Sequence, residues 1–559
     1  MKSAPVTTMM AVCYKLLLPA TAWALSGSVT PIAPAAPVAP AVASTATRVA
    51  GIVARIQNAL DEACATEAAS AAAAPAPLAV GALATGGGRV ELAARLRAKH
   101  YAVLRLPGFD GGRLRSAAEA LLDDDAALLR VGGAAPVAPD RPAEFVGVFG
   151  GDGPGRFAEG RYGGDGRARP PGLAEEAGPA LDESRRVLGA LGALLSRALL
   201  PDAEARVADD VSADGGRREV STTAHRLCRY APSSEAVVFG AHTDTSFFTL
   251  VPLSSPPGLE VFDPSLDAWV RPEAAEGAEA TDVLCMPGEF LELASAGAFR
   301  AVVHRVLGGP TKRVSTPLLV RGDRRFALGG VNAHDCWRAL QESEPDRAAE
   351  AIRGAPAHVD GASYVAPHRT RAEAETFYSL ALGGAAEVLS ADPLVVLLPA
   401  FASHADCVAV LAAADASKTA RLDDAAAPAD LALRAAAVAE LPPAHAERWR
   451  VDTYGPGDEP RADAAAGRFA TLALYLDDGF AGGATAFPDL GLTVAPKRGD
   501  AIFVRDARAP LLRADRLAVA AHAAARREEL PVEAGVKHVL TRGFRAAPFP
   551  DGAPSNDGD

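Results

Sequence analysis

Two histidines and one aspartate in the first half of the chain have the residue types and the spacing of a metal site. His242 and Asp244 lie two positions apart in an apolar, β-prone stretch, so on a strand their side chains would project from the same face. His304 lies in a second β-branched run, Val302 to Val306. We therefore predict that His242, Asp244 and His304 bind one metal ion together.

The make-up of this triad indicates which metal and which chemistry to expect. Two imidazoles and one carboxylate form the facial triad of non-haem Fe(II) oxygenases, which leaves the opposite coordination positions open. A 2-oxo acid can chelate the metal through two of these positions, and O2 can take the third. The triad therefore predicts an oxidation that uses Fe(II), a 2-oxo acid and O2.

Arg313 and Ser315 supply a second signal. They lie nine and eleven positions beyond His304 and would share one face of a strand. A guanidinium gives bidentate, charge-assisted bonds to a carboxylate, and the hydroxyl adds another donor. An isolated arginine more often forms a structural salt bridge. With the triad in this order, we interpret the pair as the site for the distal carboxylate of 2-oxoglutarate.

The surrounding sequence predicts the elements that would position these side chains. From 226 to 321, short apolar strands alternate with Pro/Gly turns, which is typical of a sandwich or jelly roll. Helical apolar spacing over 90–100 and a strand-like run over 101–107 precede it, and 181–200 indicates another helix. We expect a mixed, β-rich fold with flanking helices.

On these residues, the first half resembles the isopenicillin N synthase-like 2-oxoglutarate/Fe(II) dioxygenases. The motifs that carry the likeness are Tyr230-Ala-Pro, His242-Thr-Asp244, Pro257-Gly-Leu-Glu-Val261, Pro287-Gly-Glu-Phe-Leu291, His304-Arg-Val and Arg313-Val-Ser315. The resemblance implies a double-stranded β-helix (jelly roll) that binds Fe(II) through the triad and 2-oxoglutarate through Arg313, Ser315 and Tyr230. It also implies decarboxylation of 2-oxoglutarate to succinate and CO2, with O2 as co-substrate and ascorbate as a candidate reductant.

The second half, over about 392–545, resembles the prolyl 4-hydroxylase-like dioxygenases. The motifs are Asp392-Pro-Leu-Val-Val-Leu-Leu-Pro399, Tyr454-Gly-Pro-Gly457, Gly482-Gly-Ala-Thr-Ala-Phe-Pro488 and Pro531-Val-Glu-Ala-Gly-Val-Lys537. The iron histidines are missing, because the His-x-Asp position reads Arg461-Ala-Asp463 and the distal position is Arg527. An arginine stays protonated and cannot ligate Fe(II). Lys537 remains at the position that pairs with the distal carboxylate of 2-oxoglutarate.

We therefore expect the second half to be a catalytically silent copy of the fold. Arg461 and Arg527 are candidates to bind a carboxylate in the vacated pocket. His522 is a less favoured candidate for a shifted ligand, since it lies five residues out of register.

The 559 residues are thus predicted to hold two jelly rolls in tandem. We expect a leader over 1–60, the first domain over 88–340, a linker over 341–390, the second domain over 391–548 and an acidic tail over 549–559. The first 60 residues contain no Asp or Glu and carry signal- and transit-like features. These features favour a targeting leader for the secretory pathway, a plastid or another organelle.

Composition excludes several classes of function. The net charge of −13 argues against nucleic acid or an anionic membrane as the main partner. No apolar run reaches the roughly 18 residues that span a bilayer. Six cysteines without a C-x-x-C motif argue against a disulfide scaffold and against a structural zinc site.

The leading interpretation is a dioxygenase that hydroxylates or desaturates a small organic substrate. The intact half resembles a family that acts largely on small metabolites, which favours a small-molecule substrate. The alternatives are a non-catalytic binding or scaffolding protein built on two dioxygenase-like barrels, a peptidyl-proline hydroxylase, and an iron enzyme with another co-substrate. A protein partner of the second domain is left unidentified by the sequence.

Overall fold

The computed structural model describes residues 38–66, 74–123, 148–149, 155–161, 177–200, 222–322, 327–356, 369–414, 418–441, 443–458, 461–462, 468–506, 511–513, 516–518 and 522–545. The described residues within Met1–Val80, Glu91–Ser196 and Glu204–Asp360 form one compact unit, unit 1. Those within Gly81–Val90, Arg197–Ala203 and Gly361–Asp559 form a second, unit 2. Across these described stretches, no helix combines the length and the apolar character needed to cross a membrane.

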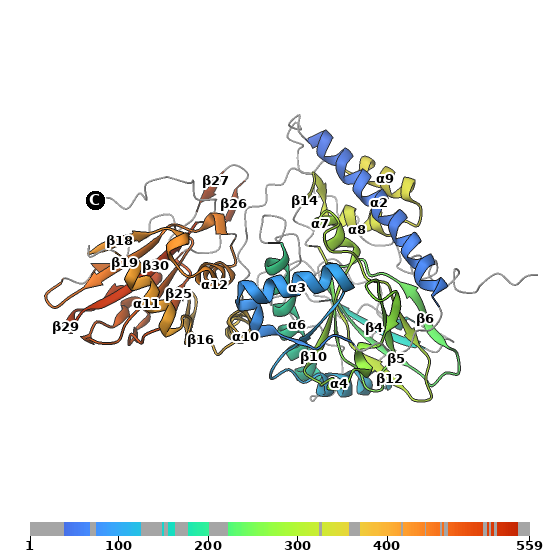
Figure 1. Ribbon diagram of the computed structural model, residues 1–559, viewed down its shortest axis with the longest axis horizontal. Helices are drawn as coiled ribbons and strands as arrows, with labels where there is room; N and C mark the ends of the chain where they lie inside the picture. The colour runs from blue at the N-terminus through green and yellow to red at the C-terminus, as the bar shows by residue number, and fades with distance from the viewer. Residues whose placement is uncertain are drawn as a thin grey trace, which may run out of the picture. The chain divides into compact units, whose positions relative to one another are not determined.

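Unit 1 is built on two β-sheets (Figure 1). The larger sheet has the strand order β1 (Leu78–Ala79), β2 (Ala102–Arg105), β10 (Asp282–Pro287), β7 (Phe248–Pro252), β13 (Leu318–Val320), β5 (Ala224–Tyr230), β4 (Gly155–Arg161), β3 (Val148–Phe149), with β12 (Arg313–Ser315) also paired to β5. The smaller sheet has the order β6 (Val237–His242), β11 (His304–Leu307), β8 (Leu259–Asp263), β9 (Ala268–Val270). A separate hairpin joins β14 (Ala327–Leu328) to β15 (Val331–Asn332).

The core of unit 1 lies between these two sheets. Its buried residues come from both, for example Val251 and Leu284 from the larger sheet and Val261 and Val306 from the smaller one. The two sheets, antiparallel except for the short β1–β2 pair, bury their inner faces against each other and form the sandwich predicted from the sequence. The β-rich, mixed fold class is therefore confirmed for unit 1.

Helices flank these sheets. They are α2 (Val38–Ala65), α3 (Gly86–Lys99), α4 (Gly111–Asp123), α6 (Ala177–Leu199), α7 (Glu289–Ala294), α8 (Ala333–Leu340) and α9 (Pro345–Gly354), with 3-10 turns at Val80–Ala84 and Pro272–Ala274. Helix α4 packs on β5 and β12. The helices expected near 90–100 and 181–200 and the strand near 101–107 are confirmed as α3, α6 and β2.

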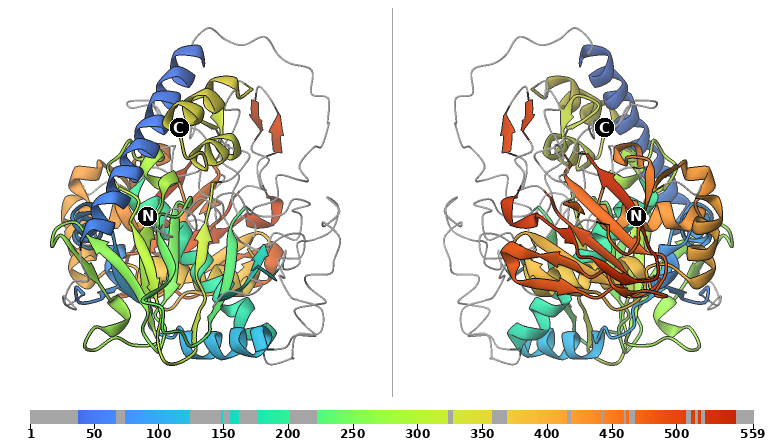
Figure 2. Two further views of the ribbon diagram at one scale, coloured as in Figure 1. Left: turned by 90° about the vertical axis from the view of Figure 1, so that its right-hand side faces the viewer. Right: turned by 90° about the vertical axis from the view of Figure 1, so that its left-hand side faces the viewer.

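Helix α2 occupies much of the segment that the sequence predicted to be a leader. It packs against α9, α7, α8 and β6, and it runs beside the yellow helix α9 in Figures 1 and 2. Arg55 donates to the buried carboxylate of Glu292 on α7, with an Nε–Oε1 distance of 2.5 Å. The Trp269 indole N–H donates to the carbonyl of Ala63 at 3.1 Å.

The prediction of a leader over 1–60, with the first domain starting at 88, is therefore wrong from Val38 onward. The buried face repeats at helical spacing over Val49, Ile52, Val53 and Ile56. The alanine-rich composition concealed this period, since alanine fits both faces of a helix. Residues 1–37, on which the targeting interpretation now depends, lie outside the described residues.

Unit 2 also contains two principal sheets. Seven strands run in the order β16 (Glu387–Ala391), β17 (Leu394–Leu398), β25 (Ala501–Val504), β21 (Ala470–Tyr475), β30 (Lys537–Phe544), β19 (Trp449–Tyr454), β18 (Thr419–Leu422). Four run in the order β20 (Arg461–Ala462), β28 (Glu528–Glu529), β23 (Thr485–Phe487), β24 (Leu492–Val494). Two further pairs are β22 (Ala481–Gly482) with β29 (Val532–Ala534) and β26 (Leu511–Arg513) with β27 (Arg516–Ala518).

The predicted linker over 341–390 is largely folded where it is described. Helix α9 packs on α2 and α8 in unit 1, whereas α10 (Arg371–Leu382) packs on β16 and on α12 (Ala429–Ala439) in unit 2. The remaining helix of unit 2 is α11 (His404–Ala413), with 3-10 turns at Asp424–Ala426, Pro443–His445, Pro488–Leu490 and Ala523–Ala525. The acidic tail over 549–559 lies outside the described residues.

If α2 is part of the folded unit, Ile56→Ala should lower the free energy of unfolding. Ile56 is 4% exposed, and truncating a buried isoleucine to alanine costs about 2–5 kcal/mol. Chemical denaturation of the full chain measures the change. Asn58→Ala, at an exposed position of the same helix, is the matched control and should cost about 0.5 kcal/mol or less. Equal small effects for both variants would contradict the packing of α2.

Candidate metal centre and co-substrate pocket

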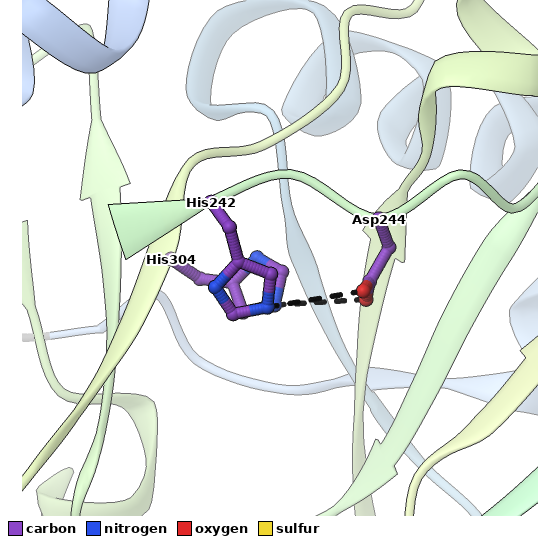
Figure 3. Close-up of side chains that lie close together, drawn as sticks. All are labelled: His242, Asp244 and His304. Atoms are coloured by element: carbon purple, nitrogen blue, oxygen red, sulfur yellow. Dashed lines mark ion pairs between the residues drawn. The ribbon is translucent and has the colours of Figure 1, made fainter. Parts of the chain in front are cut away.

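The three predicted metal ligands converge in unit 1. His242 ends β6 and His304 begins β11, and the two residues pair directly across the ladder. Figure 3 shows their rings beside each other, both facing the Asp244 carboxylate. The ring centroids are 4.1 Å apart, and the Nε2 atoms of His242 and His304 lie 3.9 and 3.6 Å from the Asp244 oxygens.

Both imidazoles are held by backbone carbonyl groups. Nδ1 of His242 lies 2.8 Å from the oxygen of Gly240, and Nδ1 of His304 lies 3.2 Å from that of Val302. A carbonyl oxygen only accepts, so in the neutral ring Nδ1 carries the hydrogen and Nε2 keeps its lone pair. Both free lone pairs thus face the Asp244 carboxylate, as metal binding requires.

The electrostatics of the triad also suit a metal. Burial, followed by the neighbouring His304, lowers the pKa of His242 to about 3 against the opposing effect of Asp244. Burial acts to raise the pKa of Asp244, but His304, His242 and the hydrogen bond from Thr249 outweigh it and hold that pKa below its usual range. At neutral pH His242 is therefore a neutral imidazole and Asp244 an ionised carboxylate, the protonation states that bind divalent metals.

Asp244 reaches the site from a loop and not from a strand. Strand β6 ends at His242, so the prediction that His242 and Asp244 share one strand face is wrong, although both side chains do converge. The loop is held by the buried carboxylate of Glu289, which accepts from Thr243 Oγ1 at 2.6 Å and from Thr245 Oγ1 at 2.7 Å. The Glu289 backbone N–H also donates to the Asp244 carbonyl at 2.9 Å.

Two further contacts tighten this loop. Thr249 on β7 donates its hydroxyl to Asp244 Oδ2 at 2.6 Å, which orients the carboxylate. A Cβ at Gly288 would overlap the backbone of Ser246 and of Asp244, so glycine is required where the start of α7 meets the loop. Asp244 is thereby positioned by contacts from two sides.

The triad opens into a cavity that also holds the predicted co-substrate residues. Arg313 and Ser315 lie at alternate positions of β12, and Tyr230 pairs with Arg313 from β5. Together with the triad they line the cavity, whose remaining lining residues are Arg226, Cys228, Phe239, Thr249, Val251, Leu259, Met286, Val306, Pro317 and Leu319. The strand-face prediction for Arg313 and Ser315 is consistent with this lining.

Arg313 is held by a second buried glutamate. Its Nη2 donates to Glu273 Oε1 at 2.6 Å, and its Nε lies 3.3 Å from Oε2. Glu273 also accepts the backbone N–H groups of Ser254, Gly258 and Leu259. The remaining nitrogen, Nη1 of Arg313, is buried and has no hydrogen-bond partner among the described residues. A buried donor without a partner is costly, and a carboxylate in the cavity would satisfy it.

The residues present therefore fit both expected ligands. The triad offers two nitrogens and one oxygen within 4.8 Å of one another, and it is the one such group found among the described residues. This donor set suits Fe(II). The orphaned Arg313 donor beside Ser315 suits the free carboxylate of a dicarboxylic 2-oxo acid.

Four residues that shape the site were not singled out from the sequence: Arg226, Thr249, Glu273 and Glu289. Glu289 belongs to the Pro287-Gly-Glu motif, which was an available signal without an assigned role. Glu273 lies 40 residues from Arg313 in sequence and no spacing rule connects them. Arg226 lies on the same face of β5 as Tyr230, and Thr249 lies on the same face of β7 as Val251. Only the pairing of the strands in the structure reveals that these two faces line the cavity.

Lys537 in unit 2 is engaged by its own surroundings. It is 1% exposed, donates to the carbonyl of Gly483 at 2.6 Å, and forms an ion pair with Glu529. Glu529 also accepts from Thr485 Oγ1 at 2.8 Å, and Thr485 accepts from the Tyr475 hydroxyl at 2.7 Å. These groups form one buried network.

The other predicted residues of unit 2 are spread over several contacts. The backbone of Arg461 on β20 lies opposite that of Glu529 on β28 in the strand register. Nη1 of Arg527 lies 3.9 Å from Asp506. His522 lies 3.1 Å from Asp392, which speaks against its use as a shifted ligand. Asp463 falls outside the described residues.

Comparison with known proteins shows what the segment that carries the site is similar to. The model of the 2OG-Fe(II) oxygenase superfamily matches residues 222–322. Gibberellin 3-beta-dioxygenase 2-3 of Triticum aestivum is 38% identical over 76 residues, which are 13% of this chain and 20% of the wheat protein. Prolyl 4-hydroxylase subunit alpha-1 of Bos taurus is 41% identical over 73 residues, 10% of this chain and 14% of that subunit.

Among solved structures, the dioxygenase for auxin oxidation in rice is similar with a TM-score of 0.34 and 17% identity, over 44% of this chain and 83% of the rice chain. The chain spans 20% of the length of the wheat relatives that it matches. The cofactors of the matched superfamily, Fe(II) and 2-oxoglutarate with O2, are those predicted from the sequence. Residues 222–322, which carry the triad, thus match the model of the 2OG-Fe(II) oxygenase superfamily.

Proposed function

We propose that this chain is an Fe(II)- and 2-oxoglutarate-dependent dioxygenase whose working centre lies in unit 1. The observation that carries the proposal is a single cavity lined by the triad and by Arg313, whose buried Nη1 has no partner among the described residues. Succinate and CO2 are the expected products of the co-substrate. The substrate is a small organic molecule, which is hydroxylated or desaturated.

Each ligand residue has a defined part in this proposal. His242, His304 and Asp244 hold Fe(II), which supplies O2 activation and the oxidation of a C–H bond when bound. The carbonyls of Gly240 and Val302 keep the two rings turned with Nε2 toward the metal. Three protein ligands leave room for a chelating co-substrate and for O2.

The co-substrate is bound by the opposite wall. Nη1 of Arg313 and the hydroxyl of Ser315 donate to its distal carboxylate. Burial raises the pKa of Tyr230 well above its ordinary value, so its hydroxyl stays protonated and can donate as well. Apolar residues such as Phe239 and Leu259 also line the cavity, exclude water, and favour a substrate with an apolar part.

We further propose that unit 2 is a second jelly roll of the same superfamily that does not bind iron. Its seven-stranded and four-stranded sheets and the prolyl 4-hydroxylase-like motifs support the fold. Arginine at both histidine positions, 461 and 527, and the pairing of Lys537 with Glu529 support the loss of the iron centre.

Removal of one imidazole tests the working centre. The full chain is loaded anaerobically with Fe(II) and 2-oxoglutarate, and succinate is measured after O2 is admitted. His304→Ala should reduce succinate to the level of the metal-free protein, because two remaining ligands hold Fe(II) poorly. Arg527→Gln, the control in unit 2, should retain wild-type release. Wild-type release from His304→Ala would refute the site, and loss in Arg527→Gln would contradict a silent unit 2.

Removal of Glu289 tests the loop that positions Asp244. Glu289→Ala deletes both threonine hydrogen bonds, and loss of such supporting contacts lowers metal affinity by about tenfold or more. Calorimetric titration with Mn(II) measures it. Glu292→Ala is the matched control, since Glu292 is equally buried on the same helix but binds Arg55. It should lower the melting temperature while keeping Mn(II) affinity. Equal affinities in both variants would show that Glu289 does not position the ligand.

A further inference from the structure

Arg226 brings a second cation into the cavity. It lies on the same face of β5 as Cys228 and Tyr230, and all three side chains line the cavity. Neither the triad nor the predicted pair Arg313 and Ser315 accounts for it. Its position relative to these two groups follows from the strand register.

One side of Arg226 is the co-substrate wall. On β5, Tyr230 pairs with Arg313 and Cys228 pairs with Ser315. The backbone N–H of Arg226 donates to the carbonyl beyond this pair, at Pro317, over 2.8 Å. Alternate residues of a strand are roughly 6.6 Å apart, so the backbone of Arg226 is two such steps removed from the level of Arg313.

The other side of Arg226 is the metal end. Ala224, the next residue on this face, pairs with Leu319, which pairs in turn with Thr249 on β7. The Thr249 hydroxyl holds Asp244. Ala224, Leu319 and Thr249 thus form one row of paired residues across three strands, and Arg226 lies two residues along β5 from this row. Its charge acts on the pKa of Asp244, after the larger effects of burial and of the two histidines.

The charges of the expected ligands also favour a further cation at the cavity. Glu273 neutralises Arg313, so this pair adds hydrogen bonds without net charge. A divalent metal is offset in part by Asp244, and bound 2-oxoglutarate adds two negative charges. One negative charge would remain without a partner in an enclosed site, which is strongly unfavourable. The guanidinium of Arg226 lines the same cavity and offers further charge-assisted donors for a carboxylate there.

We propose that Arg226 binds the carboxylate at the keto-acid end of the 2-oxo acid, while Arg313 and Ser315 bind the distal carboxylate. The order of residues along β5 carries this assignment. The co-substrate must extend from Arg313, which is opposite Tyr230, to the metal, and Arg226 lies between these two ends, nearer to the metal. The proposal rests on the proposed function of the site. It assigns a co-substrate residue that the triad and the Arg-x-Ser pair do not supply.

Two ligands separate the ends of the co-substrate. 2-Oxoglutarate has both carboxylates, whereas 2-oxopentanoate keeps the keto-acid end and lacks the distal carboxylate. Both are titrated calorimetrically into the Mn(II)-loaded full chain. The variants are Arg226→Gln, the charge-retaining Arg226→Lys, and Ser315→Ala at the distal end. Arg229→Gln is the matched control, since Arg229 lies on β5 but does not line the cavity.

We expect Arg226→Gln to weaken both ligands by a similar factor of about ten or more, as loss of a charge-assisted contact does. Arg226→Lys should recover part of this loss. Ser315→Ala should weaken only 2-oxoglutarate, and Arg229→Gln should weaken neither ligand. A loss confined to 2-oxoglutarate in Arg226→Gln would place Arg226 at the distal end and overturn the proposal. Unchanged affinities in that variant would overturn it as well.

The same titrations separate this proposal from the proposed function. If the wild-type chain bound neither Mn(II) nor 2-oxoglutarate, the function itself would fail, and the role of Arg226 with it. If the wild type bound both and Arg226→Gln matched it, only the role of Arg226 would fail. Affinity for Mn(II) alone should be unchanged or higher in Arg226→Gln, because a like charge is removed. A clear loss of Mn(II) binding would mean that Arg226 supports the metal site, and would also overturn the proposal.

Discussion

The antiparallel pairing of β6 with β11 holds His242 directly opposite His304, and the rest of the site is arranged around that pair. A slip of one residue would turn one imidazole to the other face of the sheet. Strand β11 is also paired on its other side with β8, where His304 meets Val261, so its register is set twice. The third ligand has no strand to define it, and its position depends on side-chain contacts instead.

Three buried glutamates provide such contacts around the sheets. Glu289 holds the Asp244 loop, Glu273 holds Arg313, and Glu292 joins Arg55 of α2 to the backbone N–H of Ala301. A buried carboxylate is stable only where several donors converge. Each of these residues therefore ties together segments that are distant in sequence. The metal ligands and the cation of the co-substrate wall depend on this buried polar frame as much as on the apolar core.

The sequence was sufficient to predict which candidate site residues come together and less so to predict what supports them. His242, Asp244, His304, Arg313 and Ser315 could be predicted, because their types and order are specific to one kind of site. The supporting glutamates Glu273 and Glu289 could not, since hydrogen bonds over 40 or more positions follow no local period. Helix α2 was missed for a different reason: in an alanine-rich chain, small residues on both faces conceal the apolar stripe that identifies a helix.

Each unit buries a cation beside a glutamate, Arg313 in unit 1 and Lys537 in unit 2, with different results. Arg313 gives Nε and Nη2 to Glu273 and still has Nη1 directed at no other described group. Lys537 donates hydrogen bonds to Glu529 and to the carbonyl of Gly483 from a single nitrogen. A guanidinium distributes five donors over three nitrogens, so a glutamate can hold one edge while another edge binds a ligand. An ammonium has three donors on one nitrogen, and Glu529 and Gly483 already take two of them, so a carboxylate approaching Lys537 would compete with Glu529. The same buried ion pair therefore leaves an arginine site open and closes a lysine site.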